Sequence, residues 1–211
     1  MRWIIVLLVL VTLSGCATPA SNTQVSQILL IDPGHGGFDG GTVATDGTRE
    51  KDINLAVSLC LRDMLYVCGV PVELTRDTDI ATGSNKTADM QERLRLYERS
   101  SIVIAIHQNH FHQAKYSGAQ VFYSANHPES ARLAETMQDA IVSRLQPQNT
   151  RSIKAATDGI YLMYHTTVPA ILVECGFLSN PEELALLKQS DYRQYMAWSL
   201  CLGYWEYRIE S

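Results

Sequence analysis

Three short segments that are almost continuously apolar limit what this chain can fold into. They occupy residues 28–32, 102–106 and 170–173, and leucine, isoleucine, valine and alanine make up most of each. Strands without alternating polar residues are typical of a parallel sheet that helices cover on both faces. Between these segments the chain carries apolar residues at helical spacing, most clearly over residues 50–67. The sequence therefore predicts an α/β fold, a three-layer sandwich with a mostly parallel central sheet flanked by helices.

Weaker patterns predict the remaining elements. Two more strands are expected at residues 70–75 and 118–124, and further helices at residues 88–99, 128–145, 182–188 and 191–207. The 211 residues show no shift of composition that would indicate a second domain. Because the net charge is −5 and no basic run exceeds two residues, nucleic acid is not expected as a partner.

The N-terminus has the pattern of an export signal. Arg2 precedes an apolar stretch at residues 3–11, about half of the roughly twenty residues that a membrane-spanning helix needs. The following Leu-Ser-Gly-Cys resembles the lipobox of bacterial lipoproteins, in which cleavage leaves the cysteine to carry lipid. This resemblance implies a signal peptide at residues 1–15, a tether at residues 16–27 that begins with a lipidated Cys16, and a folded domain at residues 28–211. The protein would then be exported and anchored to the outer face of the cytoplasmic membrane; a short uncleaved anchor is the alternative.

Four more cysteines follow: Cys60, Cys68, Cys175 and Cys201. Cys60 and Cys68 are eight residues apart on a predicted helix, about 12 Å along its axis, which is too far for a disulfide. There is no Cys-x-x-Cys pair that would indicate a zinc–thiolate site. We expect four free, half-buried thiols.

Each of the three apolar strands is followed by a polar group that can do chemistry. These groups are His35, His107 and Glu174, while Glu50 opens the helix at residues 50–67, where the helix dipole favours a carboxylate. In parallel sheets, ligands bind beyond the carboxyl ends of the strands. Two histidines and two glutamates are the donors of a catalytic zinc site, with three protein ligands and a position open to water. We therefore predict one Zn²⁺ ion held by His35, Glu50 and His107, with Glu174 as the catalytic base.

The glycines around His35, in LLIDPGHGGFDGG, let backbone and substrate approach a metal closely. The stretch lacks the Gly-Lys-Ser/Thr ending of a phosphate-binding loop, which excludes that reading. Asp32 and Asp39 are candidates to orient His35 through its other ring nitrogen.

Six stretches occur in order: LLIDPGHGGFDGG, REKDINLAV, LTRDTD, IAIHQN, GAQVFYS and PAILVECGFLSNPEE. Together they resemble the zinc-dependent N-acetylmuramoyl-L-alanine amidases of bacterial cell walls, the amidase-3 family. The chain looks most like the germination-specific members, which help to mature the spore cortex. The resemblance implies hydrolysis of the amide between the lactyl group of N-acetylmuramic acid and L-alanine in peptidoglycan. It assigns His35, Glu50 and His107 as metal ligands and Glu174 as the catalytic glutamate.

The same resemblance suggests substrate contacts and partners. Asn109 lies in the IAIHQN motif, and Arg151 matches a basic position that precedes the family's last strand, where a guanidinium suits a peptide carboxylate. A solvated surface arginine is the alternative. Ala105 and His110 depart from the family pattern, and His110 and His112 are candidates to line the substrate groove or to bind a second ion. The implied partners are peptidoglycan, the membrane through the lipid anchor, and a peptidoglycan deacetylase of the same pathway. The chain is expected to be a monomer, located in the cell envelope or between the forespore membranes.

Three rival functions remain open. A non-catalytic wall-binding lipoprotein is disfavoured because all four site residues are intact. A Cys–His hydrolase would use Cys175, but neighbouring side chains on a strand point to opposite faces, so Glu174 and Cys175 cannot both reach the site. An apolar strand end also lacks the positive charge that activates a thiol. A zinc peptidase of similar architecture is disfavoured by the motifs alone.

Overall fold

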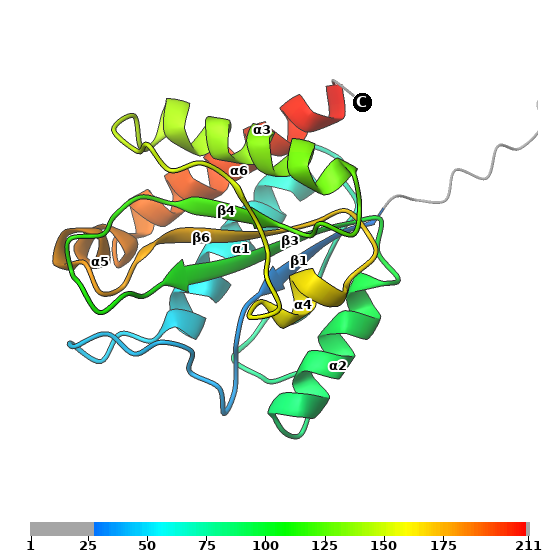
Figure 1. Ribbon diagram of the computed structural model, residues 1–211, viewed down its shortest axis with the longest axis horizontal. Coiled ribbons are helices and arrows are strands. Elements are labelled where there is room, and N and C mark those ends of the chain that lie inside the picture. Colours follow the sequence, from blue (N-terminus) through cyan, green and yellow to red (C-terminus); the bar gives the residue numbers. More distant parts are fainter. Residues whose placement is uncertain (1–27, 210–211) are drawn as a thin grey trace, which may run out of the picture.

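A six-stranded sheet forms the middle layer of the computed structural model, which describes residues 28–209 (Figure 1). The expected signal peptide, Cys16 and the tether lie outside the described residues. None of the helices within residues 28–209 combines the length and apolar character needed to cross a membrane.

The strands lie in the order β2-β1-β3-β6-β4-β5. Only β4 runs antiparallel to its neighbour β6, and the other pairs are parallel, so the predicted mostly parallel sheet is confirmed. The strands are β1 (Leu29–Pro33), β2 (Val72–Leu74), β3 (Ile102–Asn109), β4 (Gln120–Tyr123), β5 (Lys154–Ala155) and β6 (Ala170–Phe177).

Helices cover both faces of this sheet. On one face, α1, α3 and α6 pack with side chains such as Ile31, Ile104 and Val173. On the other face, α2 and α4 pack with Leu30 and Val103. The short helix α5 follows β6, and its Leu184 and Leu187 pack in the first cluster. The predicted three layers are therefore confirmed. The helices are α1 (Glu50–Val67), α2 (Lys86–Tyr97), α3 (Glu129–Arg144), α4 (Tyr161–His165), α5 (Pro181–Leu187) and α6 (Ser190–Ile209).

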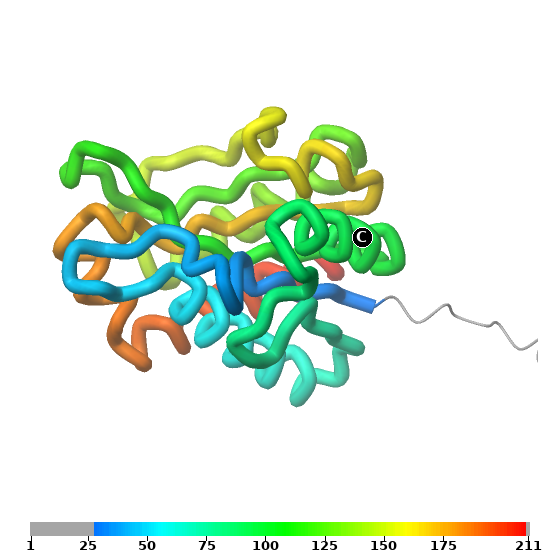
Figure 2. The backbone as a smooth tube through the Cα atoms, turned by 90° about the horizontal axis from the view of Figure 1, so that it is seen from below, coloured from blue at the N-terminus to red at the C-terminus, as the bar shows by residue number. Residues whose placement is uncertain are grey.

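The carboxyl edge of β1 and β3 carries the long connections that matter for function. The loop between β1 and α1 extends from this edge, away from the point where residue 28 enters the sheet, as Figures 1 and 2 both show. Asn85 caps the start of α2, where its side chain accepts a hydrogen bond from the Ala88 amide. This cap starts the helix two residues earlier than the apolar pattern indicated.

Two strands are longer than the sequence indicated. β3 continues to Asn109 and β6 to Phe177, so His107 and Glu174 lie within strands rather than after them. These two residues are directly paired in the parallel register between β3 and β6. The two-residue β5 and the five-residue α4 were not predicted at all.

The four described cysteines are free, as predicted. Their burial differs from the expectation, because only Cys60 is half-buried, Cys68 is exposed, and Cys175 and Cys201 are buried.

Candidate active site

The two histidines and the helix-opening glutamate meet at the carboxyl edge of the sheet. Glu50 Oε1 lies 3.2 Å from His35 Nε2 and 3.0 Å from His107 Nδ1. The two imidazole rings are 5.0 Å apart at their centroids and nearly perpendicular. One potential donor atom from each of the three residues lies within 4.8 Å of the other two. Because zinc–nitrogen and zinc–oxygen bonds measure about 2.0–2.2 Å, one ion can reach all three.

Glycines make this convergence possible. A Cβ atom on Gly34 would lie 2.2 Å from His107 Nε2, and one on Gly41 would lie 2.6 Å from Glu50 Oε2. His35 itself has a φ of 62°, which only glycine adopts without cost. The glycine-rich turn after β1 therefore has a structural reason. Gly34 leaves room for the His107 ring to pack on the backbone, and the turn holds the His35 backbone in the left-handed conformation. This crowding by donor atoms fits a small cation.

Asp39 orients His35. The ring nitrogen Nδ1 donates to Asp39 Oδ2 at 2.8 Å, which leaves Nε2 directed towards Glu50. Lys86 Nζ contacts the same carboxylate oxygen. Burial opposes ionisation of Asp39, but the hydrogen bonds from Lys86 and His35 outweigh it and lower its pKa. Burial opposes the charged form of His35, but the hydrogen bonds and charges of Glu50 and Asp39 outweigh it and raise the pKa of His35.

The prediction that Asp32 also orients His35 was wrong. Asp32 is fully buried and forms an ion pair with Arg93 and hydrogen bonds with Thr75 and Tyr97. Its influence on His35 is indirect, because Arg93 also donates to the His35 carbonyl oxygen at 2.6 Å. The reason is geometric: Asp32 is a β1 residue on the face that α2 covers, where Arg93 lies.

Glu50 is surrounded by hydrogen-bond donors. Besides its two histidine contacts, Oε2 accepts from the Thr42 amide at 2.9 Å and Oε1 from the Gln108 amide at 3.2 Å. Burial opposes the charge, but His107 and His35 stabilise it and lower the pKa of Glu50 well below its usual range. Glu50 is therefore an anion in this site, as a metal-ligating carboxylate must be.

Glu174 has the opposite environment. It lies beside His107 on the neighbouring strand, and its buried Oε2 atom has no hydrogen-bond partner among the described residues. Burial, reinforced by the negative charge of Glu50, raises the pKa of Glu174 to about 8. A carboxyl group poised near neutral pH suits proton transfer.

Cys175 is buried in the apolar core, on the face of β6 opposite to Glu174. Burial raises its pKa to about 12, so the thiol stays protonated at neutral pH. The structure therefore gives no support to a Cys–His hydrolase.

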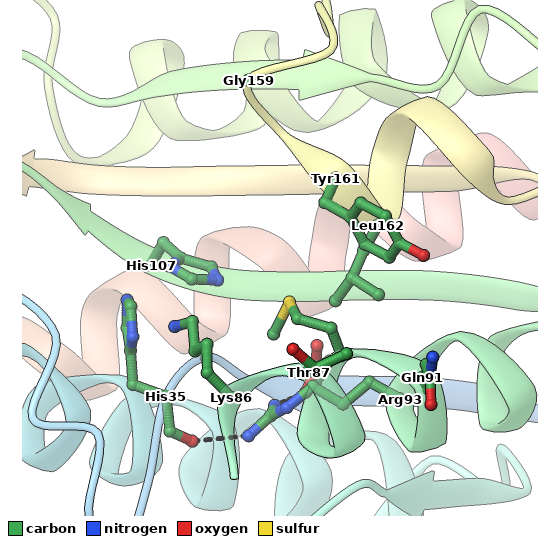
Figure 3. A pocket seen from close by; sticks show the side chains of 12 residues that line it. His35, Lys86, Thr87, Gln91, Arg93, His107, Gly159, Tyr161 and Leu162 are labelled. Carbon is green, nitrogen blue, oxygen red and sulfur yellow. Dashed lines mark hydrogen bonds and ion pairs between the residues drawn. The ribbon is translucent and has the colours of Figure 1, made fainter.

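Two cavities open onto the two histidines. One, of about 530 Å³, is polar and is lined by Glu174 and Asn109, together with Asp39, Gly41, Thr42, Glu50, Gln108 and His110. The other, of about 470 Å³, lies between α2 and α4 (Figure 3). Its lining includes Lys86, Tyr161 and Leu162, none of which the sequence analysis singled out. Lys86 could have been predicted as a site residue, because it begins a helix at the same sheet edge. Tyr161 could not, because α4 is too short to show a periodic pattern.

Other candidates lie outside the three-residue cluster. Arg151 lines a separate cavity, where it donates to the Ser117 carbonyl oxygen at 2.7 Å and to Gln120 Oε1 at 3.0 Å. Its guanidinium also lies 4.6 Å from the centre of the Phe177 ring. Within residues 28–209, His110 and His112 belong to no group of three or more metal-ligating side chains.

Comparisons with known proteins agree with this geometry. Residues 29–204 match the Amidase_3 family, described as N-acetylmuramoyl-L-alanine amidase. The germination-specific N-acetylmuramoyl-L-alanine amidase of Bacillus subtilis (strain 168) is 38% identical over 203 residues, which cover 92% of this chain and 84% of that relative.

Two solved structures of similar fold are also amidases. The CwlD amidase from Clostridioides difficile, solved in complex with the GerS lipoprotein, superposes with a TM-score of 0.83 at 33% identity, covering 88% of this chain and 100% of that chain. An N-acetylmuramoyl-L-alanine amidase from Clostridium difficile 630 superposes with a TM-score of 0.79 at 27% identity, covering 87% of this chain and 97% of that chain.

Proposed function

Because the chain belongs to the Amidase_3 family of N-acetylmuramoyl-L-alanine amidases, we propose that it is a zinc-dependent member that acts on spore cortex. The enzyme is a peptidoglycan hydrolase that cleaves between N-acetylmuramic acid and L-alanine. The observation that carries the zinc proposal is the convergence of His35, Glu50 and His107, with one donor atom from each within 4.8 Å of the others.

In this proposal, His35, Glu50 and His107 hold one Zn²⁺ ion. The chemistry that the ion supplies when bound is polarisation of the scissile carbonyl group and acidification of a water molecule. Asp39 keeps the lone pair of His35 Nε2 directed towards the ion by accepting from Nδ1 at 2.8 Å. Glu50 contributes the negative charge that favours a divalent cation.

Glu174 moves the proton. Its carboxylate accepts a proton from the attacking water and then returns it to the amine of the departing alanine. The unpartnered Oε2 atom and the pKa of about 8 support this role, because a group that is hydrogen-bonded elsewhere could not take up and release a proton as readily.

Substrate contacts and location are further parts of the proposal. Asn109 lines the polar cavity beside Glu174 and is proposed to contact the substrate. Arg151 donates a hydrogen bond to Gln120, and Gln120 pairs with Glu174 between β4 and β6. We propose that Arg151 binds a carboxylate of the stem peptide. Export and anchoring through a lipidated Cys16 remain predictions, as do a monomeric state and a deacetylase in the same pathway. Similarity to CwlD, which was solved with a lipoprotein, supports a protein partner.

The test is mass spectrometry of the products that the purified protein releases from peptidoglycan and from spore cortex. We expect glycan strands whose N-acetylmuramic acid residues carry no peptide, and intact stem peptides that begin with L-alanine. Both products should be lost after chelation and recovered with zinc. Thiol alkylation should have no effect. Fragments cut within the stem peptide would indicate a zinc peptidase, and no release in any condition would indicate a binding protein; either result contradicts the proposal.

A further inference from the structure

The outer side of α4 carries a row of aromatic side chains. Tyr161 and Tyr164 are 41% and 50% exposed, which is high for such large rings. His165 lies between them, with ring centroids 4.4 Å from Tyr161 and 5.3 Å from Tyr164. We call Tyr161, His165 and Tyr164 the α4 aromatic row.

The row is fixed to the core from below. The two residues in the middle of α4, Leu162 and Met163, are buried and pack in the apolar cluster between α2, α4 and the sheet. An exposed platform on so short a helix is therefore held in place by its own buried residues. Such preorganised aromatic surfaces lose little entropy on binding.

The row is continuous with the cavity beside the histidines. Tyr161 and Leu162 from α4 line the cavity of about 470 Å³, and α2 contributes Met90 together with Lys86, Thr87, Gln91 and Arg93. His35 and His107 line the same cavity, and Figure 3 shows them on the side away from Tyr161 and Leu162. A ligand bound at the histidines can thus extend along Tyr161 and Leu162 onto the surface of α4.

The second cavity at the histidines differs in character. It is lined by polar groups such as Thr42, Gln108 and Asn109, and it contains Glu174. The two cavities share His35 and His107 in their linings. In one direction from the histidines, the cavity therefore has an aromatic and apolar α4 side, while its α2 side also carries Lys86, Thr87, Gln91 and Arg93. In the other direction, the cavity is lined mainly by polar groups.

The two parts of the substrate match these environments. A pyranose ring presents flat faces of C–H groups that pack on aromatic rings while its hydroxyl groups stay in water, and tyrosine combines an apolar ring with a polar tip. A stem peptide instead presents amides and carboxylates, which need polar partners. We propose that the glycan lies on the α4 side, with the muramyl sugar in the α2–α4 cavity and the next sugars on the aromatic row. The stem peptide then leaves along Asn109 and Thr42. This inference rests on the amidase function and adds the direction in which the substrate lies.

The test compares Tyr164→Ala and Tyr161→Ala with Tyr195→Ala in the full-length protein. Tyr195 is 60% exposed on α6, on the opposite face of the sheet, and serves as the matched control. For Tyr164→Ala, we expect the KM for polymeric glycan substrate to rise about tenfold more than the KM for a single-sugar muramoyl peptide, with kcat unchanged. Tyr164→Phe should restore the wild-type KM, because the ring is kept.

A binding measurement separates this inference from the catalytic one. The probe is a peptide-free strand of alternating N-acetylglucosamine and N-acetylmuramic acid, titrated into metal-free protein. We expect both α4 alanine variants to bind about tenfold more weakly than wild type, a loss of about 1.4 kcal/mol, and Tyr195→Ala to bind normally. Wild-type affinity in both α4 variants would overturn the inference even if hydrolysis is normal. So would variants that lose affinity for free stem peptide instead of glycan. A wild-type protein that binds glycan but cleaves nothing would contradict the amidase function and leave the glycan site standing.

Discussion

The start of α1 and the carboxyl-terminal half of β6 each bring a glutamate to the same site, but the two glutamates have different surroundings. Glu50, at the start of α1, is surrounded by two imidazoles and two backbone amides, and its pKa is lowered. Glu174, on β6, has a buried oxygen without a partner, and its pKa is raised to about 8.

The difference shows how one residue type obtains two opposite protonation preferences in one site. Donors around Glu50 stabilise its charged form, which suits a group that binds a cation permanently. The lack of donors around Glu174 destabilises its charged form, which suits a group that gains and loses a proton. Mutual repulsion contributes, because the charge of Glu50 itself helps to raise the pKa of Glu174.

The largest expected effect is on turnover. Glu174→Gln should lower kcat by about 10²–10⁴-fold, the usual value of general acid–base catalysis, while zinc content by atomic absorption stays at the wild-type level. His35→Ala is the comparison: it should lose both zinc and activity. Normal turnover in Glu174→Gln, or loss of its metal, would end the division of roles between the two glutamates.

An intermediate effect is expected at Asp39. Asp39→Asn removes the charge that accepts from His35 Nδ1 and should weaken zinc binding by about 10–100-fold in a competition with a chelator dye. Asp79→Asn is a suitable control, because Asp79 contacts Lys51 and the Gly37 amide rather than a histidine. Equal zinc affinity in wild type and Asp39→Asn would mean that the ring of His35 is oriented by the backbone alone.

The smallest expected effect is on stability against pH in the metal-free protein. The pKa of Glu174 is about 8 in the folded state against an ordinary value of 4.5, so between these pH values the folded state binds more protons and this group makes stability fall as pH rises. The lowered pKa of Glu50 has the opposite sign: its contribution is present above pH 4.5 and is lost as pH falls.

Urea unfolding at several pH values measures how the free energy of unfolding changes with pH in each variant. Relative to wild type, Glu174→Gln should become more stable by at most about 1.4 kcal/mol per pH unit as pH rises from 4.5 to 8. Glu50→Gln should be less stable than wild type at neutral pH, with the gap closing at acidic pH. Parallel curves for the two variants would show that the two carboxyl groups have similar environments.

The sequence predicted the architecture and the convergence of four side chains because both follow from strand ends. Buried strands have an unmistakable composition, and the groups at their carboxyl ends meet at one edge once the sheet is parallel. His35, His107 and Glu174 came from that rule, and Glu50 from the preference of helix starts for carboxylates.

What the sequence could not predict depends on neighbours that are distant in the chain. Asp32 looked like a partner of His35, but the buried Arg93, which lies 61 residues further on, takes its carboxylate instead. The five residues of α4 are fewer than two helical turns, so no period is visible in them. Their importance follows only from the cavity that they form with α2.

The pairing of His107 with Glu174 has a consequence for how errors affect this enzyme. Sliding β6 by one position along β3 would put a buried aliphatic or thiol side chain where the carboxyl group belongs, and would turn the apolar side chains of β6 towards the wrong layer. The hydrophobic effect, which fixes the register of β6 in the core, therefore also fixes the relative positions of His107 and Glu174. Damage to that interior should remove the protein altogether before it yields a folded but misaligned catalyst.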